Sequence, residues 1–358
     1  MRTALVLARR GLGNVWPNPS VGCVLVREDL DGRVVGRGWT QPGGRPHAET
    51  EALRRASKLA QGATAYVTLE PCSHIGKTEP CAVALLEAGI KRVVASMADP
   101  DPRVSGKGLS QLKTAGIKVS AGLLKREAEE LNAGFISIKE ASRPLVTLKV
   151  ATTIDGYVAS RTGNSQWITG IQARRYSHIM RARHDAILSG IGTIEADNPM
   201  LTCRVNGLEH QSPIRVIMDT HGRLASNSAI VISADKVPVW RYRDASKAPS
   251  LAPPKVDDIP SQIGPDGMLM ISGIISNLVE RGITRLLVEA GPKLTTAFLK
   301  SGYVDRIHWY RSSGIIGEDG KAAITSLGIE RLEDLKKFYR LKTLQFGPDN
   351  LEIYTRLC

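Results

Sequence analysis

The residue types best suited to chemistry lie early in the chain, in three short motifs: PHAE at 46–49, EPC at 70–72 and EPC again at 79–81. His47, Cys72 and Cys81 offer one imidazole and two thiolates, a ligand set that zinc prefers, and they leave the fourth tetrahedral position for water. Glu49 follows His47 by two residues, so its carboxylate lies near the metal without having to bind it. Such a carboxylate takes a proton from an activated water and gives it to a leaving amine. The pattern predicts hydrolytic deamination at zinc, with Glu49 as the catalytic residue.

The spacing of the two cysteines differs from the usual zinc deaminase pattern. The eight residues SHIGKTEP separate Cys72 from Cys81, where two are usual. A loop that leaves the metal and returns to it satisfies the geometry, and this loop brings His74 and Lys77 to the site. A purely structural zinc, with His74 as its fourth ligand, is the alternative.

In the second half of the chain, two glycine-containing turns are the features most suited to binding an anion. SGIGT follows the apolar run AILS, and EAGPK follows LLV, so each turn leads from a strand into a helix. Backbone amides at a helix start attract phosphates. A dinucleotide fingerprint of the Gly-x-Gly-x-x-Gly type does not follow the first strand, so a Rossmann domain is not expected.

Composition limits the protein to a soluble globular class. The 358 residues are enough for two domains, and 42% of them are hydrophobic. No apolar run reaches the roughly 18–20 residues of a membrane span. The five cysteines are too sparse for a disulfide scaffold, and we expect a cytoplasmic protein. The net charge of +13 favours anionic partners, and a phosphorylated small molecule satisfies it as well as nucleic acid does.

The order of predicted elements indicates two α/β domains. An amphipathic helix over residues 2–10 precedes a β-β-α-β-α-β-α series, which predicts a layered α/β domain. The stretch KREAEELNAGF predicts a helix, and IKEASRPL after it is expected to be the linker, with the boundary at residues 140–145. A second α/β series begins at Leu145. It includes AIVIS as an expected strand, a surface loop over 244–267 and a final strand at LEIYTRL.

Three segments make the first half similar to a known family. NPSVGCV at 18–24, PHAE and EPCSHIGKTEPC together resemble the deaminase domain of the bifunctional riboflavin biosynthesis enzymes. The resemblance implies a cytidine-deaminase-like three-layer α/β/α domain over 1–140, with one zinc ion. It implies deamination of a diaminopyrimidinone ribosylamine phosphate, with Asn18, His74 and Lys77 binding this substrate. An amide suits a pyrimidine edge, and a cation suits a phosphate.

Three positions depart from the family's pattern. Thr40 and Glu51 stand where histidines are usual, and Glu79 replaces the first proline of Pro-Pro-Cys. None of them removes a ligand or the catalytic carboxylate, so the departures bear on substrate affinity. The first motif also lies close to Met1, which is consistent with a missing N-terminal helical turn.

Four segments of the second half resemble the reductase domain of the same family: KVATTIDGYVAS (149–160), GNSQWITG (163–170), GIGTIEADNPMLTCR (190–204) and VEAGPKLTTAFL (288–299). The resemblance implies a dihydrofolate-reductase-like α/β domain over 145–358, NADPH as hydride donor, reduction of the ribosyl group to ribityl, and a homo-oligomer. It implies that NADPH is bound by Ala151, Trp167, Thr193, Asp197, Thr220, Gly291, Pro292, Lys293, Leu294, Thr295, Thr296 and Ala297. It implies that substrate is bound by Ser165, Arg181, Leu201, Arg204 and Glu289.

These roles fit the chemistry of the side chains. Arg181 and Arg204 can hold a phosphate through bidentate hydrogen bonds, and Glu289 can accept N–H groups of the pyrimidine. Trp167 offers a flat wall beside a ring. Lys149 and Asp155 are further candidates for contacting the sugar and for positioning.

Three alternatives to the two-step enzyme stay open at this point. A nucleic-acid or nucleoside deaminase with an accessory domain agrees with the charge, although aromatic residues make up only 5% of the chain. A reductase with a weakened deaminase agrees with the three departures. A non-catalytic zinc protein leaves Glu49 unexplained. We therefore expect an enzyme that acts on a small phosphorylated pyrimidine, without nucleic-acid or membrane partners.

Overall fold

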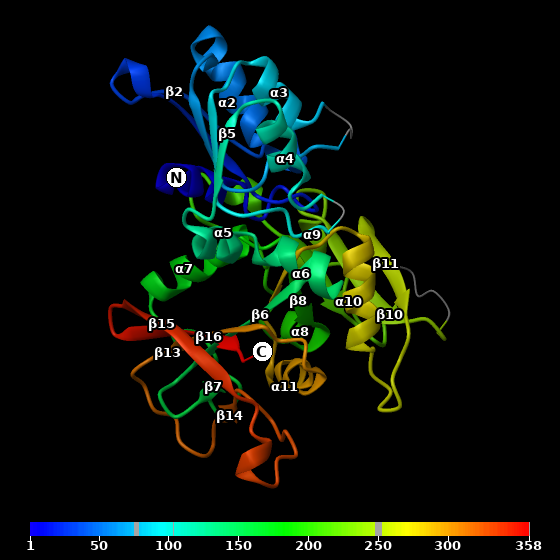
Figure 1. Cartoon of the computed structure of the whole chain (residues 1–358). Coiled ribbons are helices and arrows are strands. Elements are labelled where there is room, and N and C mark those ends of the chain that lie inside the picture. The colour runs from blue at the N-terminus through cyan, green and yellow to red at the C-terminus, as the bar shows by residue number, and fades with distance from the viewer. Residues whose placement is uncertain (75–78, 103, 248–252, 358) are drawn as a thin grey trace. The chain divides into compact units, whose positions relative to one another are not determined.

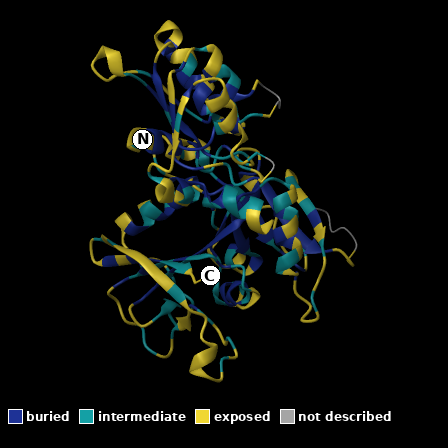
Figure 2. Ribbon diagram, viewed as in Figure 1, coloured by how far each residue is buried: buried dark blue, intermediate teal, exposed yellow. Residues whose placement is uncertain are grey.

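The computed structural model describes residues 1–74, 79–102, 104–247 and 253–357. The chain forms two compact units, Met1–Ser142 and Arg143–Cys358 (Figure 1). Each unit is built on its own β-sheet, whose central strands are buried (Figure 2). Among the described residues, no helix combines the length and the apolar character needed to cross a membrane.

The sheet of the first unit has five strands in the order β2-β1-β3-β4-β5. β1 pairs with β2 and with β3 in antiparallel fashion, and β3, β4 and β5 are parallel. A tight turn at Asp31 and Gly32, both with positive φ, joins β1 to β2, as the Asp-Gly pair favours. The strands are β1 (Gly22–Arg27), β2 (Arg33–Trp39), β3 (Thr64–Val67), β4 (Arg92–Ala95) and β5 (Lys118–Ala121).

Helices cover both faces of this sheet, which gives the expected three layers. α2, α3 and α4 pack in series on one face, and α1 and α5 pack on the other. The helices are α1 (Arg2–Ala8), α2 (Ala48–Ala56), α3 (Cys81–Glu87), α4 (Lys107–Thr114), α5 (Lys125–Leu131) and α6 (Ala133–Ala141).

Close packing of α2 against β2 depends on two glycines. A Cβ atom at Gly36 would lie 2.3 Å from the Ala52 carbonyl oxygen, and one at Gly38 would lie 2.1 Å from that of Ala48. Cys23 and Leu25 of β1 pair with these glycines and lie in the same core as the alanines of α2. The start of α2, which carries the PHAE motif, is thereby held against the sheet.

The sheet of the second unit has nine strands in the order β11-β10-β9-β8-β12-β6-β13-β16-β15. The seven strands from β11 to β13 are parallel, and β16 and β15 complete the sheet in antiparallel fashion. The strands are β6 (Leu145–Thr152), β8 (Ala186–Gly190), β9 (Ile214–Met218), β10 (Val239–Asp244), β11 (Val256–Ser261), β12 (Arg285–Val288), β13 (Arg306–Arg311), β15 (Phe338–Phe346) and β16 (Asp349–Arg356).

Parallel strands end at one edge of a sheet, and ligands bind outside that edge in open α/β folds. Here the segments that follow β8, β9 and β12 meet there. The helices of the unit are α7 (Ile171–Ala182), α8 (Ile191–Asp197), α9 (Ala229–Ile232), α10 (Ile271–Glu280) and α11 (Pro292–Ser301), and a small sheet pairs β7 (Tyr157–Ala159) with β14 (Lys321–Ala322).

Three predicted elements are wrong in part. The run AIVIS forms helix α9 instead of a strand, because a short apolar run fits either element and the tertiary context decides. The expected surface loop over 244–267 contains β11, an edge strand that tolerates Pro260 because, among the described residues, a strand pairs with it on one side alone. The expected linker IKEASRPL is helical as far as Ala141, so α6 takes up the first half of it.

Candidate active sites

His47, Cys72 and Cys81 converge in the first unit. Their ligand atoms all lie within 4.8 Å of one another. Nδ1 of His47 lies 3.3 Å from Sγ of Cys81 and 3.7 Å from Sγ of Cys72. A tetrahedral zinc with bonds of about 2.0–2.3 Å needs ligand separations of about 3.5 Å. The donor set and its spacing therefore fit a zinc ion.

Two of these ligands lie at helix starts. His47 is the N-cap residue of α2, and Cys81 is the first residue of α3. Cys72 comes after β3 in a segment without regular structure, and its sulfur accepts the Cys81 backbone N–H at 3.3 Å. The hydrogen bond from the Cys81 thiol, supported by His47, lowers the pKa of Cys72 to about 4. Cys72 is thus a thiolate, the form that binds metal.

Glu49 lies in the first turn of α2, beside the ligands, and is 3% exposed. Burial, followed by the charge of the Cys72 thiolate, raises the pKa of Glu49 to about 7. A group that titrates near neutral pH both accepts and releases protons efficiently. A cation bound by these ligands would oppose the rise in the Glu49 pKa that the Cys72 thiolate causes.

The predicted contacts with the deaminase substrate differ in how far the structure describes them. Asn18 packs over the backbone of Gly44, which precedes His47 by three residues. A Cβ atom at Gly44 would lie 2.0 Å from Asn18 Nδ2. His74 is exposed, and among the described residues it is not part of the group that could hold a metal. This favours an open fourth position over a structural zinc. Lys77 lies outside the described residues.

Two of the three departures from the family pattern have partners within the fold. Thr40 is 2% exposed, accepts the Val21 backbone N–H at 2.9 Å and donates to the Pro19 carbonyl at 3.2 Å. Glu51 forms ion pairs of 3.1 Å with Arg54 and Arg55, further along α2. Thr40 and Glu51 therefore support local structure, while Glu79 is exposed.

A cavity of about 2060 Å³ lies in the second unit, at the edge where the parallel strands end. Ligand pockets commonly measure about 300–1,000 Å³, so this one has room for a dinucleotide together with a substrate. All of the predicted reductase residues line it except Thr296. The Thr296 hydroxyl donates to the Pro292 carbonyl and accepts the Thr325 N–H, so it is buried beneath the cavity wall. Of the two further candidates, Lys149 lines the cavity, and Asp155 instead accepts the Gly317 N–H at 2.7 Å.

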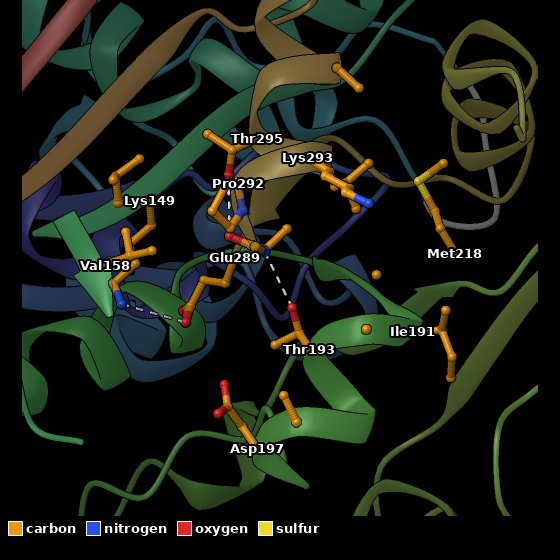
Figure 3. A pocket seen from close by; sticks show the side chains of 18 of the residues that line it. Lys149, Val158, Ile191, Thr193, Asp197, Met218, Glu289, Pro292, Lys293 and Thr295 are labelled. Atoms are coloured by element: carbon orange, nitrogen blue, oxygen red, sulfur yellow. Dashed lines mark hydrogen bonds and ion pairs between the residues drawn. The ribbon is translucent and has the colours of Figure 1, made fainter. Parts of the chain in front are cut away.

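The two glycine turns lie side by side in this cavity. Gly190 precedes α8 and Gly291 precedes α11, and the Gly291 N–H donates to the Thr193 hydroxyl at 3.2 Å (Figure 3). Pro292 has no N–H and the Gly291 N–H is bonded to Thr193, so the free amides of this turn begin at Lys293. The amides of Lys293 and Leu294 are at the helix start, where N–H groups have no intrahelical partner.

A buried ion pair also lines the cavity. Arg181 donates to Glu289 through Nε at 2.9 Å and Nη2 at 2.8 Å, and through Nη1 to the Thr202 carbonyl at 3.1 Å. Lys149 Nζ lies 3.8 Å from Glu289 (Figure 3). Burial by itself would raise the pKa of Glu289, but Arg181 and Lys149 outweigh it and lower that pKa to about 2. Glu289 therefore stays ionised and accepts hydrogen bonds.

This pairing differs from the expected grip of Arg181 and Arg204 on a phosphate. Arg181 already directs its three nitrogens to Glu289 and Thr202, since a guanidinium in a buried site pairs with the carboxylate beside it. Arg204 is exposed at the cavity wall and remains open to an anion.

His178 was not among the predicted residues, yet it lies in the cavity between the two arginines. Its Nε2 is 3.4 Å from Nη2 of Arg204, and its Nδ1 lies 3.0 Å from the Thr202 carbonyl oxygen and 3.3 Å from the Arg204 backbone nitrogen. Burial, followed by Arg181, lowers the pKa of His178 to about 4. Its spacing of three residues before Arg181 on one helix face was the signal in the sequence.

Trp167 is 64% exposed in the cavity mouth, and the Arg174 guanidinium lies 4.4 Å from its ring centroid. Cation–π contact at this distance holds the ring in place. The indole therefore offers the predicted flat wall.

Two family models match the chain. The RibD C-terminal domain matches residues 144–351, and the cytidine and deoxycytidylate deaminase zinc-binding region matches residues 1–97. The riboflavin biosynthesis protein RibD of Escherichia coli is 41% identical over 98% of this chain and 96% of its own length. That of Aquifex aeolicus is 40% identical over 99% and 97%.

Solved structures agree over the whole chain. A RibD structure from Acinetobacter baumannii has a TM-score of 0.87 at 36% identity, covering 100% of this chain and 98% of that one. A diaminohydroxyphosphoribosylaminopyrimidine deaminase/5-amino-6-(5-phosphoribosylamino)uracil reductase from Thermotoga maritima has a TM-score of 0.88 at 36% identity, covering 100% and 97%. The chain therefore belongs to the RibD family, whose members join a zinc-binding deaminase domain to an NADPH-using reductase domain in riboflavin biosynthesis.

Proposed function

We propose that the protein carries out two successive reactions on one phosphorylated pyrimidine. The first unit deaminates 2,5-diamino-6-(5-phosphoribosylamino)pyrimidin-4(3H)-one. The second reduces the ribosyl group of the product and gives 5-amino-6-(5-phosphoribitylamino)uracil. The observation that carries the proposal is buried Glu49 beside three converging metal ligands.

In the deaminase unit, His47, Cys72 and Cys81 are proposed to hold the zinc. Zinc, when bound, lowers the pKa of a water molecule and so supplies the nucleophile. Glu49 takes a proton from that water and delivers one to the amino group, which leaves as ammonia while the ring carbon gains an oxygen. Burial raises the pKa of Glu49, which suits a group that both takes and gives a proton.

Asn18, His74 and Lys77 are proposed to bind the substrate of this unit. The Asn18 amide has donors and acceptors for a pyrimidine edge, and its packing over Gly44 keeps it in one place. Lys77 is proposed as a cation for the phosphate. Thr40 has its hydroxyl occupied by Val21 and Pro19, so it takes no part in binding.

In the reductase unit, NADPH supplies a hydride to the ribosyl imine carbon, and the chain orients the two reactants. The start of α11, with the Lys293 side chain, is proposed to meet the phosphates of the cofactor. Thr193 of α8 lies beside it, and Asp197 lies further along α8 (Figure 3). Trp167, Ala151 and Thr220 complete the proposed cofactor wall.

The substrate of the reductase is proposed to bind between Glu289 and Arg204, with Ser165 and Leu201 beside it. Ionised Glu289 accepts N–H groups of the pyrimidine. Arg204 binds the phosphate, and neutral His178 holds its guanidinium. Arg181 acts as a positioning residue that fixes both Glu289 oxygens.

The setting of these reactions is also part of the proposal. We expect a cytoplasmic homo-oligomer that acts on small molecules, without nucleic-acid or membrane partners. β15 is an edge strand with exposed Tyr339 and Leu341, which is consistent with a second copy at that edge.

The roles separate in a pair of assays on two variants. Glu49→Gln should abolish deamination and leave reduction of pre-deaminated substrate at the wild-type rate. Glu289→Gln should impair reduction and leave deamination unchanged. Loss of both activities in either variant would contradict the assignment of one reaction to each unit.

A further inference from the structure

The two EPC motifs supply the proposed cysteine ligands, but the glutamate of the first has a role of its own. Glu70 is 3% exposed and is not among the metal-binding group. Its Oε2 accepts backbone N–H groups of Asp99 at 3.0 Å and Gly106 at 2.9 Å. Its Oε1 accepts those of Gly108 at 2.8 Å and Leu109 at 3.2 Å. One buried carboxylate thus receives four amide donors.

Three of these bonds join the segment that follows β3 to the start of α4, and the fourth, from Asp99, joins it to the segment that follows β4. The N-cap residue of α4 is Gly106, which has no side chain to cap the helix. Glu70 caps the helix from outside, since it accepts the Gly108 and Leu109 amides of the first turn. A carboxylate at this end also interacts favourably with the helix dipole.

The contact continues into Pro71. A Cβ atom at Gly108 would lie 2.0 Å from the Pro71 carbonyl oxygen, so the start of α4 packs directly against the segment that leads to Cys72. The Glu70 N–H also donates to the Met97 carbonyl at 3.0 Å. Glu70 and Pro71 are therefore fixed on both sides before the chain reaches the metal ligand.

Cys72 needs such support more than the other two ligands do. His47 and Cys81 lie at the starts of α2 and α3, whose backbones are held by their own helices. Cys72 instead follows residues 68–71, which form neither helix nor strand. Groups behind the ligands orient them and affect metal affinity.

We infer that Glu70 is a positioning residue for the zinc site: by capping α4 it fixes the backbone that presents Cys72. The inference rests on the proposed ligation by His47, Cys72 and Cys81. It predicts that removing the four bonds weakens zinc binding more than a substitution that lowers the stability of the unit to the same extent.

Glu70→Gln tests this with little change in size. A carboxamide keeps one acceptor oxygen but turns an NH₂ group toward two amide donors. Leu112→Ala is the matched control, because Leu112 is 1% exposed on the same helix α4 and its truncation loosens packing without touching the Glu70 bonds. Glu70→Asp, which keeps the charge on a shorter side chain, is the milder second variant.

Zinc affinity is measured on each full-length protein by competition with a chromogenic chelator, and the Co²⁺-substituted proteins are compared by their thiolate-to-metal absorption. We expect Glu70→Gln to weaken zinc binding by at least about tenfold and to alter the cobalt spectrum. Glu70→Asp should fall between it and wild type. Leu112→Ala should lower Tm yet bind zinc within about threefold of wild type.

Wild-type zinc affinity in Glu70→Gln and Glu70→Asp would overturn the inference alone. So would an equal loss of affinity in Leu112→Ala at an equal loss of Tm, because the effect would then be general. Failure of the wild-type protein to bind zinc, or binding that survives Cys72→Ala, would overturn the proposed metal centre together with this inference.

Discussion

Arg181 and Glu289 lie 108 positions apart in the chain and face each other through two parallel hydrogen bonds of 2.9 and 2.8 Å. The pair joins α7 to the residue that follows β12, at the wall of the reductase cavity. It holds a carboxylate in its anionic form at the place where we propose that the pyrimidine binds. It also stabilises the unit, because each partner would otherwise be a buried charge.

Glu289→Gln should destabilise the protein. Removing one member of a buried pair leaves Arg181 and Lys149 without their counter-charge, which costs about 3 kcal/mol. The free energy of unfolding in urea measures this. Glu195→Gln is the control, because Glu195 and its partner Arg223 are 43% and 51% exposed, and such a pair contributes about 0–1 kcal/mol. An equal loss in both variants would contradict the buried-pair interpretation.

The same pair gives a dependence of stability on pH. The folded pKa of Glu289 is about 2, below its ordinary value of 4.5, so the unfolded state binds more protons between these values. The contribution of Glu289 is fully present above about pH 4.5 and is lost as the pH falls toward 2. The difference in unfolding free energy between wild type and Glu289→Gln should therefore become smaller in this range, because Glu289 becomes protonated. Other buried groups such as His308 titrate in both proteins, so their effect cancels in the difference. A gap that stays constant down to pH 2.5 would contradict the depressed pKa.

Arg204→Ala should raise the KM of the reductase for its phosphorylated substrate by at least about tenfold. The substitution removes a hydrogen bond to a charged group, which contributes about 1.5–3 kcal/mol to binding. A substrate without the phosphate is the control and should react equally with both enzymes. His178→Leu should give a smaller rise of the same kind, because it removes only the partner of the guanidinium. A fall in kcat with unchanged KM would argue against phosphate binding by Arg204.

Metal removal should separate the two activities. Cys81→Ser or prolonged chelation should remove the bound zinc and the deamination, since the described residues offer three protein ligands and Cys81 is one of them. The rate of reduction of pre-deaminated substrate should not change. Zinc content and both rates, measured on one preparation, check this. Retention of deamination without metal would contradict a zinc mechanism.

The sequence was sufficient to predict which three side chains converge as possible metal ligands, because these residues lie in short motifs. His47 and Glu49 lie at the start of one helix and Cys81 at the start of another, so local spacing places them correctly. The resemblance supplied most of the cavity residues. The pairing of Arg181 with Glu289 could not be predicted, because it depends on how α7 packs beside β12. The role of Glu70 also depends on residues about 30 to 40 positions away.

The fold was predicted least well where charged or short segments enter the second sheet. β10 contains Arg241 and Arg243, so its sequence does not have the apolar pattern of a buried strand. Both arginines can be buried because they donate hydrogen bonds to Asp258 of β11. β11 itself contains Asp258 and Pro260 and has the composition of a loop. Ion pairing between neighbouring strands thus replaces the apolar pattern that sequence analysis relies on.

The most direct test of the central claim follows the mass of one substrate through both reactions. Zinc-loaded protein is mixed with the diaminopyrimidinone ribosylamine phosphate, first without and then with NADPH. We predict that the substrate exchanges one amino group for oxygen without NADPH, and that the product gains two hydrogen atoms once NADPH is added. If the wild-type protein does not deaminate the substrate but does reduce pre-deaminated substrate, it is a reductase without a working deaminase. Absence of both changes would contradict the assignment to this pathway.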